Sequence, residues 1–344
     1  MSVVNISITG GAGFIGSNLA EASVRAGHEV TLLDNLSRRG SEANLSWLRE
    51  TLGRDSFRFV RADVRDFEAM RKAVSGAGAI YHLASQTAVT TSVSDPRHDF
   101  EVNALGAFNV LEAVRLQAPD AVLIYSSTNK VYGSMEDVRA IETLTRYVLP
   151  AYPMGVPETR PLDFHSPYGC SKGAADQYFR DYARIYGLRT AVFRQSCIYG
   201  QRQMGVEDQG WVAWFVIAGV TGKPISIYGN GKQVRDLLHV DDLVRAFQTT
   251  TAQIDSASGQ VYNLGGGPEN TLSVWCEFGP LLQELFGFEV KPARFSDWRP
   301  GDQPVFVADV RKATAELGWS PQVSVRDGNG RLIEWVRANR ELFE

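Results

Sequence analysis

The chain has 344 residues, of which 44% are hydrophobic and 22% charged, and its formal net charge is −4. This balance argues against a nucleic-acid-binding protein, which needs a clustered excess of Lys and Arg, and the longest apolar run, residues 211–220, covers about half of a membrane span. Three cysteines are too few for a disulfide framework, and the chain begins with a strand-like segment without a basic leader, so we expect a cytoplasmic globular protein.

Apolar, β-rich runs alternate with helical patterns through the first half of the chain. Strands are expected at residues 3–9, 29–33, 57–60, 79–83, 122–126 and 190–194. Helices are expected between them, at residues 15–26, 42–52, 66–75, 99–117 and 168–186. Strands that alternate with helices predict an α/β fold with a doubly wound parallel sheet, the Rossmann arrangement.

The alternation breaks after residue 195, where turn residues become frequent. We therefore expect a Rossmann domain over residues 1–195 and a smaller C-terminal α/β lobe over residues 196–344, with some crossing of the chain between the two. Residues 134–165 contain several prolines and little periodicity, so they are expected to form a long loop, and long loops in compact domains are often functional.

A glycine-rich turn joins the first expected strand to the first helix. Gly10, Gly13 and Gly16 have the spacing GxxGxxG, and Phe14 and Ile15 lie within the motif. Without Cβ atoms, such glycines allow a tight turn, a close approach of the backbone to a pyrophosphate, and close packing of the helix on the sheet. The unpaired N–H groups at the helix N-terminus then face the phosphates. The motif predicts a dinucleotide site.

Acidic residues follow the next two expected strands. Asp34 ends the second strand, 18 residues after Gly16. A carboxylate there accepts a hydrogen bond from a ribose 2′-OH and repels a 2′-phosphate, which favours NAD over NADP. Arg38 and Arg39, close by, would suit a phosphate and weaken this preference. Asp63, after the third strand, has two interpretations: a contact with the adenine, or the N-cap of a helix.

Tyr168 and Lys172 lie four residues apart at the start of an expected helix. On a helix these side chains share one face, and an ammonium beside a phenol favours the phenolate by lowering the phenol pKa. This pair predicts a proton-transferring site. Thr128 follows the fifth strand, at the sheet edge where doubly wound proteins bind ligands, so its hydroxyl is a candidate partner of the reacting oxygen. An ordinary turn rich in Ser and Thr is the alternative.

Together these motifs resemble the extended short-chain dehydrogenase/reductase family, which includes nucleotide-sugar epimerases and dehydratases. The resemblance covers nearly the whole chain and rests on residues 9–16, 34–35, 82–84, 126–133, 168–172, 235–242 and 299–302. It implies a catalytic triad of Thr128, Tyr168 and Lys172, with Tyr168 as the acid and base. We expect no metal site, because His165 and His239 have no partner at metal-ligand spacing in the sequence.

The same resemblance implies the binding residues. NAD would be bound by Gly10, Gly13, Phe14, Ile15, Gly16, Asp34, Asn35, Asp63, Val64, Leu83, Ala84 and Lys172. A nucleotide-diphosphate sugar would be bound by Gln86, Asn129, Lys130, Gln195, Ser196, Cys197, Arg235 and Arg299. The two arginines would contact the diphosphate, and a homodimer or homotetramer would form through residues 99–117 and 168–186.

Two further features narrow the reaction. The 4,6-dehydratases of the family carry an Asp-Glu pair after the threonine, whereas this chain has Asn129 and Lys130, which cannot easily supply that acid and base. Residues 127–133, 163–172, 194–200 and 207–215 are most similar to 2-epimerases of the CDP-paratose/CDP-tyvelose type. This similarity implies NAD-dependent epimerisation at C2 of a CDP-sugar, through a transient keto-sugar and return of the hydride. The alternatives are a UDP-glucose/galactose-type 4-epimerase and, more remotely, a non-catalytic dinucleotide-binding protein.

Overall fold

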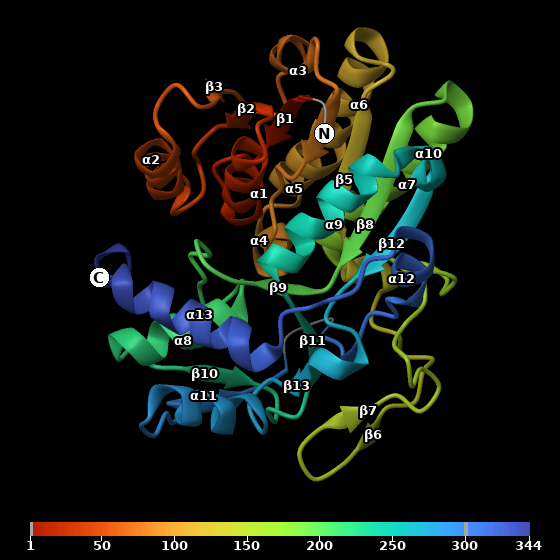
Figure 1. The fold of residues 1–344 in the computed structure, drawn as a ribbon. Coiled ribbons are helices and arrows are strands. Elements are labelled where there is room, and N and C mark those ends of the chain that lie inside the picture. The colour runs from red at the N-terminus through yellow and green to blue at the C-terminus, as the bar shows by residue number, and fades with distance from the viewer. Residues whose placement is uncertain (1–2, 299–301) are drawn as a thin grey trace. The chain divides into compact units, whose positions relative to one another are not determined.

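The computed structural model describes residues 3–298 and 302–344 (Figure 1). Contacts divide the chain into two compact units, each built from several segments. Unit 1 comprises residues 1–128, 166–194 and 244–262, and unit 2 comprises residues 129–165, 195–243 and 263–344. One crossing between the units lies at residues 194 and 195; the domain extents expected from the sequence stay predictions.

The central sheet has seven strands in the order β12-β8-β5-β4-β1-β2-β3. The strands are β1 (Asn5–Thr9), β2 (Glu29–Asp34), β3 (Arg58–Arg61), β4 (Ala79–His82), β5 (Val122–Thr128), β8 (Arg189–Gln195) and β12 (Gln260–Leu264). The four pairings that lead from β3 through β2, β1 and β4 to β5 are parallel. The strand order 3-2-1-4-5 is that of the doubly wound fold, so the predicted fold class is confirmed.

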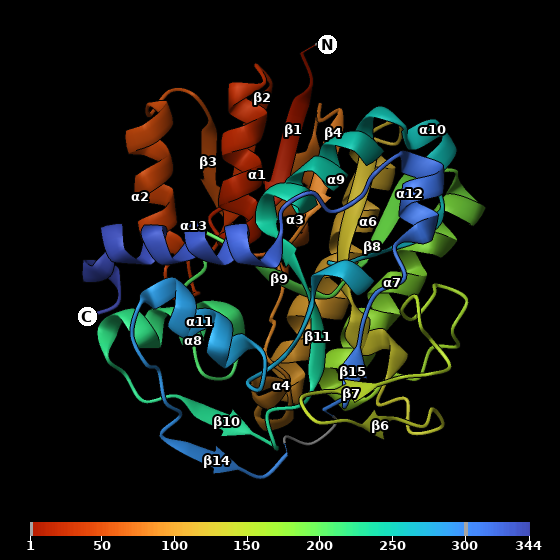
Figure 2. The same cartoon turned by 60° about the horizontal axis from the view of Figure 1, so that its bottom comes forward.

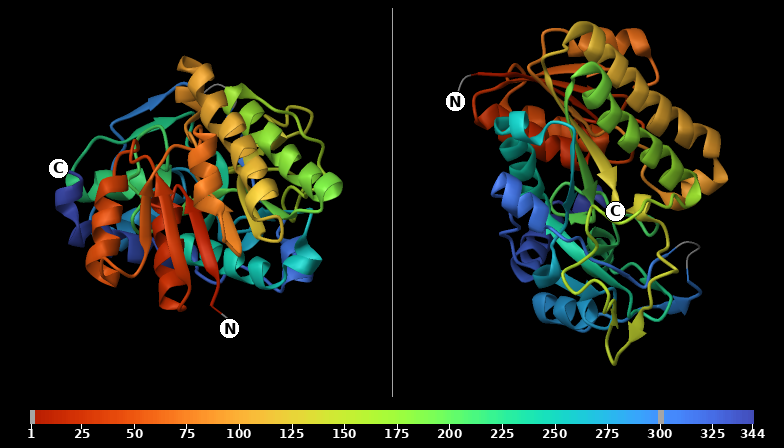
Figure 3. Two further views of the ribbon diagram at one scale, coloured as in Figure 1. Left: turned by 90° about the horizontal axis from the view of Figure 1, so that it is seen from above. Right: turned by 90° about the vertical axis from the view of Figure 1, so that its right-hand side faces the viewer.

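Helices cover both faces of this sheet. They are α1 (Phe14–Arg25), α2 (Ser41–Leu52), α3 (Phe67–Val74), α4 (Val89–Ser94), α5 (Pro96–Phe100), α6 (Gly106–Gln117), α7 (Ser166–Tyr186), α9 (Val240–Ala252) and α10 (Ile254–Ala257). Ile80 of β4 belongs to the core that α3, α6 and α7 share, whereas its neighbour Tyr81 meets Phe247 of α9. Successive side chains of a strand point to opposite faces, so a buried sheet needs apolar residues at nearly every position. Figure 3 shows α6 and α7 side by side.

The segment 99–117 is helical, as expected, but it is not one uniform α-helix, because a π-helical turn divides it. Asp95 caps α5 by accepting a hydrogen bond from the His98 N–H, and Pro96 occupies the first turn. A π-helical turn, Glu101–Leu105, then separates α5 from α6. A π turn inserts an extra residue per turn without changing the hydrophobic pattern enough to be read from sequence.

Unit 2 is built around β11 (Val234–His239), which pairs with β9 and β15 in parallel and with β13 in antiparallel orientation. Its other strands are β6 (Ile141–Glu142), β7 (Tyr147–Val148), β9 (Cys197–Tyr199), β10 (Ser226–Tyr228), β13 (Thr271–Ser273), β14 (Arg294–Ser296) and β15 (Val305–Phe306). Its helices are α8 (Trp211–Thr221), α11 (Phe278–Phe286), α12 (Arg311–Leu317) and α13 (Val325–Ala338). Residues of α8, α11 and α13 form one apolar core, and Figure 2 shows β10 beside β14.

The expectation of a loop over residues 134–165 needs one correction, since β6 and β7 form a short antiparallel hairpin there. Side chains hold this hairpin to the rest of unit 2. Arg146 Nε donates to Glu277 Oε1 at 2.8 Å, and Lys232 Nζ lies 2.8 Å from Glu142 Oε1. These contacts join segments more than 80 residues apart, which local periodicity does not reveal.

Among the described helices, none combines the length and the apolar character needed to cross a membrane. Within residues 3–298 and 302–344, no group of three or more His, Cys, Asp and Glu side chains is arranged to hold a metal ion.

Candidate active site

The glycine turn between β1 and α1 forms a cradle that only glycine permits. Gly10 has a φ of +70°, and a Cβ there would lie 2.8 Å from the Ala84 nitrogen. A Cβ on Gly16 would lie 2.2 Å from the Gly10 carbonyl oxygen. Gly13 is the N-cap of α1, so the first N–H groups of the helix are not covered by its side chain. This shape fits a pyrophosphate.

Thr9 positions the second wall of this cradle. Its Oγ1 lies 2.7 Å from His82 Nδ1 and accepts a hydrogen bond from the Leu83 nitrogen at 3.2 Å. The loop after β4 is thereby held against Gly10, so the predicted cofactor residues Leu83 and Ala84 lie beside the glycine turn. Phe14 and Ile15 form the first turn of α1 next to it.

Asp34 lies at the end of β2 and is turned toward the same region. Its carboxylate accepts hydrogen bonds from the Ala12 nitrogen at 3.1 Å and the Leu36 nitrogen at 2.8 Å. Burial raises the Asp34 pKa, and these two hydrogen bonds oppose the rise. The carboxylate oxygens retain lone pairs that can accept from the hydroxyls of a ribose.

Asp63 is hydrogen-bonded to Asn35, the residue that follows Asp34. Asn35 Nδ2 donates to Asp63 Oδ2 at 2.9 Å, and hydrogen bonds from Arg65 lower the Asp63 pKa below its ordinary value. The alternative of a helix cap is wrong, since Asp66 caps α3. Val64, the next predicted cofactor residue, has its side chain in the core of unit 1.

Thr128, Tyr168 and Lys172 come together at the carboxyl end of β5 and the start of α7. The Tyr168 hydroxyl is hydrogen-bonded to the side chain of Thr128. Lys172 Nζ donates to the Ser126 carbonyl at 2.6 Å and lies 4.4 Å from the centre of the Tyr125 ring. Tyr168 is 9% exposed, and Lys172 is 3% exposed. The structure therefore gathers the three side chains predicted to be catalytic.

The expected net lowering of the Tyr168 pKa is not found in this structure, because burial outweighs the effects that favour the phenolate. Burial raises the pKa of Tyr168 to about 12, although the hydrogen bond with Thr128 opposes the rise. Burial also lowers the pKa of Lys172 to about 7, because a low-dielectric environment disfavours an ammonium as well as a phenolate. Spacing on a helix predicted the proximity of the two groups but not their desolvation.

Gln86 is the predicted substrate residue of unit 1. Its backbone nitrogen donates to Asn103 Oδ1 at 2.9 Å, and its side-chain Nε2 donates to the Ala88 carbonyl at 2.8 Å. The loop after β4 is thus tied to the π-helical turn before α6.

Two of the predicted substrate residues in unit 2 converge on a carboxylate. Arg235 Nη2 donates to Asp302 Oδ1 at 2.5 Å, and Lys130 Nζ lies 3.8 Å from the same oxygen. Burial opposes ionisation of Asp302, but the two cations lower its pKa overall. Asp302 was not among the predicted site residues, and Arg299 lies outside the described residues.

Other predicted substrate residues of unit 2 surround the start of β9. Ser196 Oγ donates to the Asp236 carboxylate, whose pKa burial raises to about 6. Cys197 Sγ accepts from Trp211 Nε1 at 3.4 Å, and burial raises the thiol pKa. Gln195 is buried immediately before them. Asn129, which begins the short 3₁₀ turn that contains Lys130, is buried as well.

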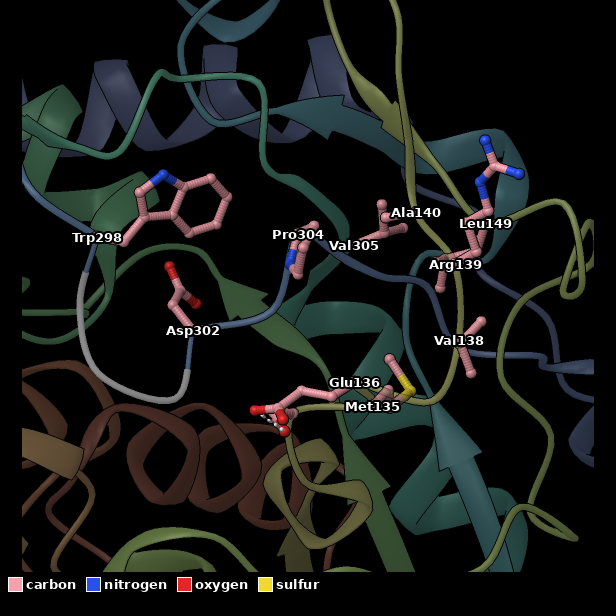
Figure 4. A pocket seen from close by; sticks show the side chains of 11 residues that line it. Met135, Glu136, Val138, Arg139, Ala140, Leu149, Trp298, Asp302, Pro304 and Val305 are labelled. Carbon is pink, nitrogen blue, oxygen red and sulfur yellow. Dashed lines mark hydrogen bonds between the residues drawn. The ribbon is translucent and has the colours of Figure 1, made fainter.

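Asp302 also borders a cavity of about 520 Å³ in unit 2 (Figure 4). The cavity is lined by Ser134, Met135, Glu136, Val138, Arg139, Ala140, Leu149, Trp298, Asp302, Pro304 and Val305. Figure 4 shows Trp298 and Asp302 across the cavity from Val138 and Leu149. Trp298 and Asp302 thus line one cavity, and Asp302 is also the carboxylate that pairs with Arg235 and Lys130.

Comparison with known proteins places the chain among nucleotide-sugar enzymes. The profile of the family described as GDP-mannose 4,6 dehydratase matches residues 8–331. The chain belongs to this family. The CDP-paratose 2-epimerase of Salmonella typhi is 46% identical over 342 residues, which cover 97% of this chain and 99% of that protein. The UDP-glucose 4-epimerase of Mycolicibacterium smegmatis is 34% identical over 331 residues, which cover 96% of this chain and 97% of the relative.

Solved structures agree with this assignment. The UDP-glucose 4-epimerase of Thermotoga maritima, solved with UDP-glucose, has a TM-score of 0.82 and 31% identity, and covers 98% of this chain and 99% of its own. The dTDP-glucose 4,6-dehydratase DesIV of Streptomyces venezuelae, solved with NAD bound, has a TM-score of 0.83 and 29% identity, with 99% of each chain covered. The predicted resemblance to the nucleotide-sugar epimerases and dehydratases is confirmed, and the chain is an enzyme of this family.

Proposed function

We propose that this protein is an NAD-dependent epimerase that inverts C2 of a CDP-sugar of the paratose/tyvelose type. The observation that carries the proposal is the 46% identity to a CDP-paratose 2-epimerase over nearly the full length of both chains. The 4-epimerase alternative has weaker support, since the UDP-glucose 4-epimerase of Mycolicibacterium smegmatis is 34% identical. Asn129 and Lys130, which follow the catalytic threonine, favour an epimerase over a dehydratase because they offer no carboxylic acid and base.

The residues of unit 1 fit a dinucleotide. The cradle at Gly10, Gly13 and Gly16 would hold the pyrophosphate, and Asp34 would accept from the adenosine ribose. NAD, when bound, supplies a reversible hydride acceptor. Because the coenzyme is restored in each catalytic cycle, we expect the purified protein to retain it.

Tyr168, Thr128 and Lys172 would handle the proton of the reacting hydroxyl. Oxidation of the C2 hydroxyl to a ketone releases one proton, which Tyr168 Oη accepts as a phenolate, and reduction from the opposite face takes this proton back. Thr128, hydrogen-bonded to Tyr168, would orient the same oxygen. The ammonium of Lys172 would stabilise the phenolate by its charge.

The cations of unit 2 would anchor the nucleotide diphosphate while the keto-sugar rotates to present its opposite face. Arg235 and Lys130 already share an anionic partner, Asp302, so their side chains are directed to one point. A diphosphate offers several anionic oxygens, and a guanidinium can bind two of them at once. The cavity bordered by Asp302 offers space beside this point.

A panel of CDP-, UDP-, GDP- and dTDP-sugars tests the proposal, with NMR used to detect inversion at each ring carbon. We expect inversion at C2 of a CDP-sugar, and turnover that is slower by about 10²–10⁴-fold in a Tyr168→Phe control. Inversion at C4 of a UDP-sugar, without action on any CDP-sugar, would establish the alternative instead.

We also infer that the chain forms a homodimer or a larger homo-oligomer through α6 and α7. These neighbouring helices expose a set of large apolar side chains, namely Phe108, Leu116, Tyr178, Ile185 and Tyr186. Such a face is typical of a protein interface. Light scattering should give at least twice the mass of one chain, and Tyr178→Arg should lower it; a monomeric wild-type protein would contradict the inference.

A further inference from the structure

Asp99 is a fully buried carboxylate at the end of α5, with 0% exposure. Its Oδ2 accepts a hydrogen bond from Ser171 Oγ at 2.6 Å, and its Oδ1 accepts from Asn103 Nδ2 at 3.0 Å. Ser171 directly precedes Lys172 on α7, whereas Asn103 lies in the π-helical turn. Both donors are neutral, so they fix the position of the carboxylate without cancelling its charge.

A second buried carboxylate on α7 provides a contrast. Asp176 is paired with Arg194, whose Nη2 and Nε lie 2.8 and 2.9 Å from its two oxygens, and it also accepts from Ser127 Oγ at 2.8 Å. A bidentate guanidinium neutralises most of the field of a carboxylate. Of the two acids, Asp99 has the larger effect on Lys172, and both raise its pKa against the burial that lowers it.

The other charged and titratable groups around this site come from four elements. On β4, His82 is neutral near pH 7, since burial lowers its pKa to about 3. On β5, Tyr125 places its ring below Lys172, and its own pKa is raised by burial. Arg38, in the loop after β2, favours the phenolate of Tyr168, whereas Asp99 disfavours it. His98 precedes Asp99 and lowers its pKa, but burial of the carboxyl outweighs this effect.

We propose that Asp99 is a positioning residue whose fixed negative charge lets Lys172 keep its proton up to a higher pH than burial alone would allow. Asp99 is held by Ser171, the residue adjacent to Lys172, and no guanidinium binds it within the described part of the chain. Lys172 Nζ donates to the Ser126 carbonyl and to no carboxylate among the hydrogen bonds described above. An ammonium buried in this way needs a nearby anion to retain its proton.

The negative charge of Asp99 has two opposite effects on catalysis. Asp99 preserves the cation that stabilises a phenolate at Tyr168, but it also raises the cost of forming that phenolate. Its removal should therefore move the upper pH limit of activity downward, instead of lowering activity equally at every pH. This kinetic part rests on the proposed function; the protonation of Lys172 does not.

Direct titration of Lys172 tests the inference in the full-length protein. The chain has seven lysines, so a ¹³Cε-lysine label gives few signals, and Lys172→Met identifies the signal of interest. Wild-type Lys172 should titrate at about pH 7. Asp99→Asn, which is nearly isosteric and can still hydrogen-bond to Ser171 and Asn103, should lower this midpoint by about one pH unit or more.

Glu101→Gln is the matched control, because it removes a partly exposed carboxylate two residues away that pairs with Arg97. It should leave the Lys172 midpoint unchanged. An Asp99→Asn protein whose Lys172 titrates as in the wild type would overturn the inference. Circular dichroism checks the fold, and Asp99→Ser provides the same loss of charge if the first variant is unstable.

The kinetic readout is the pH profile of kcat with the CDP-sugar identified by the substrate panel. In Asp99→Asn the upper limb should shift downward together with the Lys172 midpoint, so that activity above pH 7 falls by about tenfold relative to the wild type for a shift of one unit. A uniform loss at all pH values would indicate a purely structural role and would overturn the inference. If the substrate panel showed no epimerase activity, the titration of Lys172 could still be measured. The outcome for Asp99 can therefore be distinguished from the outcome for the proposed function.

Discussion

Gly16→Ala should destabilise the protein and weaken cofactor binding together, because a single methyl group has no space at this position. The new Cβ would lie 2.2 Å from the Gly10 carbonyl oxygen and 2.8 Å from the Gly11 Cα, both backbone atoms. Ordinary contact begins at about 3.4 Å, so the turn or α1 must move by about 1 Å. We expect a net loss of about 1–3 kcal/mol in the free energy of unfolding, since the overpacking outweighs the helix preference of alanine.

Urea unfolding of the protein without coenzyme measures the first effect, and calorimetric titration with NAD measures the second. Affinity for NAD should fall at least about tenfold, because the displaced turn carries the N–H groups that we expect to bind the pyrophosphate. Gly330→Ala is the control: this glycine lies in α13 with nothing within 4 Å of its Cβ position, so alanine should stabilise the protein by about 0.5–1 kcal/mol. A Gly16→Ala protein with wild-type stability and affinity would show that the turn accommodates a methyl group at this position.

Three further substitutions test the remaining parts of the site. Tyr168→Phe should lower kcat by about 10²–10⁴-fold while NAD stays bound, and near-normal turnover would remove Tyr168 from its role as acid and base. Lys172 has a pKa of about 7 in the folded chain and its ordinary value of 10.5 when unfolded. Between pH 7 and pH 10.5 the unfolded chain binds one more proton than the folded chain, so the free energy of unfolding rises with pH by up to about 1.4 kcal/mol per pH unit. Urea unfolding at several pH values should show that Lys172→Met removes this rise. An unchanged dependence of the unfolding free energy on pH would contradict the burial of Lys172. Arg235→Met should raise KM for the nucleotide sugar about tenfold or more in steady-state assays, and an unchanged KM would exclude a contact with the diphosphate.

The parts of the fold that depend on local pattern could be predicted from the sequence. The strands of the parallel sheet are buried on both faces, so their apolar runs stand out between helical stretches. The turn at Gly10 and Gly16 could be recognised because close backbone contacts exclude any side chain there. The spacing of Tyr168 and Lys172 also placed both groups on one helix face beside Thr128.

The features that depend on distant contacts could not be predicted in this way. The π-helical turn at Glu101–Leu105 follows from packing and not from periodicity, and it places Asn103 against Asp99 and Gln86. Asp302, the shared partner of Arg235 and Lys130, lies 67 residues beyond Arg235 in the chain. Desolvation was missed for the same reason: the pKa values of Tyr168 and Lys172 depend on what surrounds them in three dimensions.

The central claim is that one hydrogen leaves C2 of the sugar as a hydride and returns to the opposite face of the same carbon. CDP-paratose that carries deuterium at C2, incubated with the enzyme in ordinary water, tests this claim most directly. The product should be inverted at C2 and should retain the deuterium there. Loss of the label to solvent would show that a proton, and not a hydride, leaves the carbon, and it would exclude hydride return.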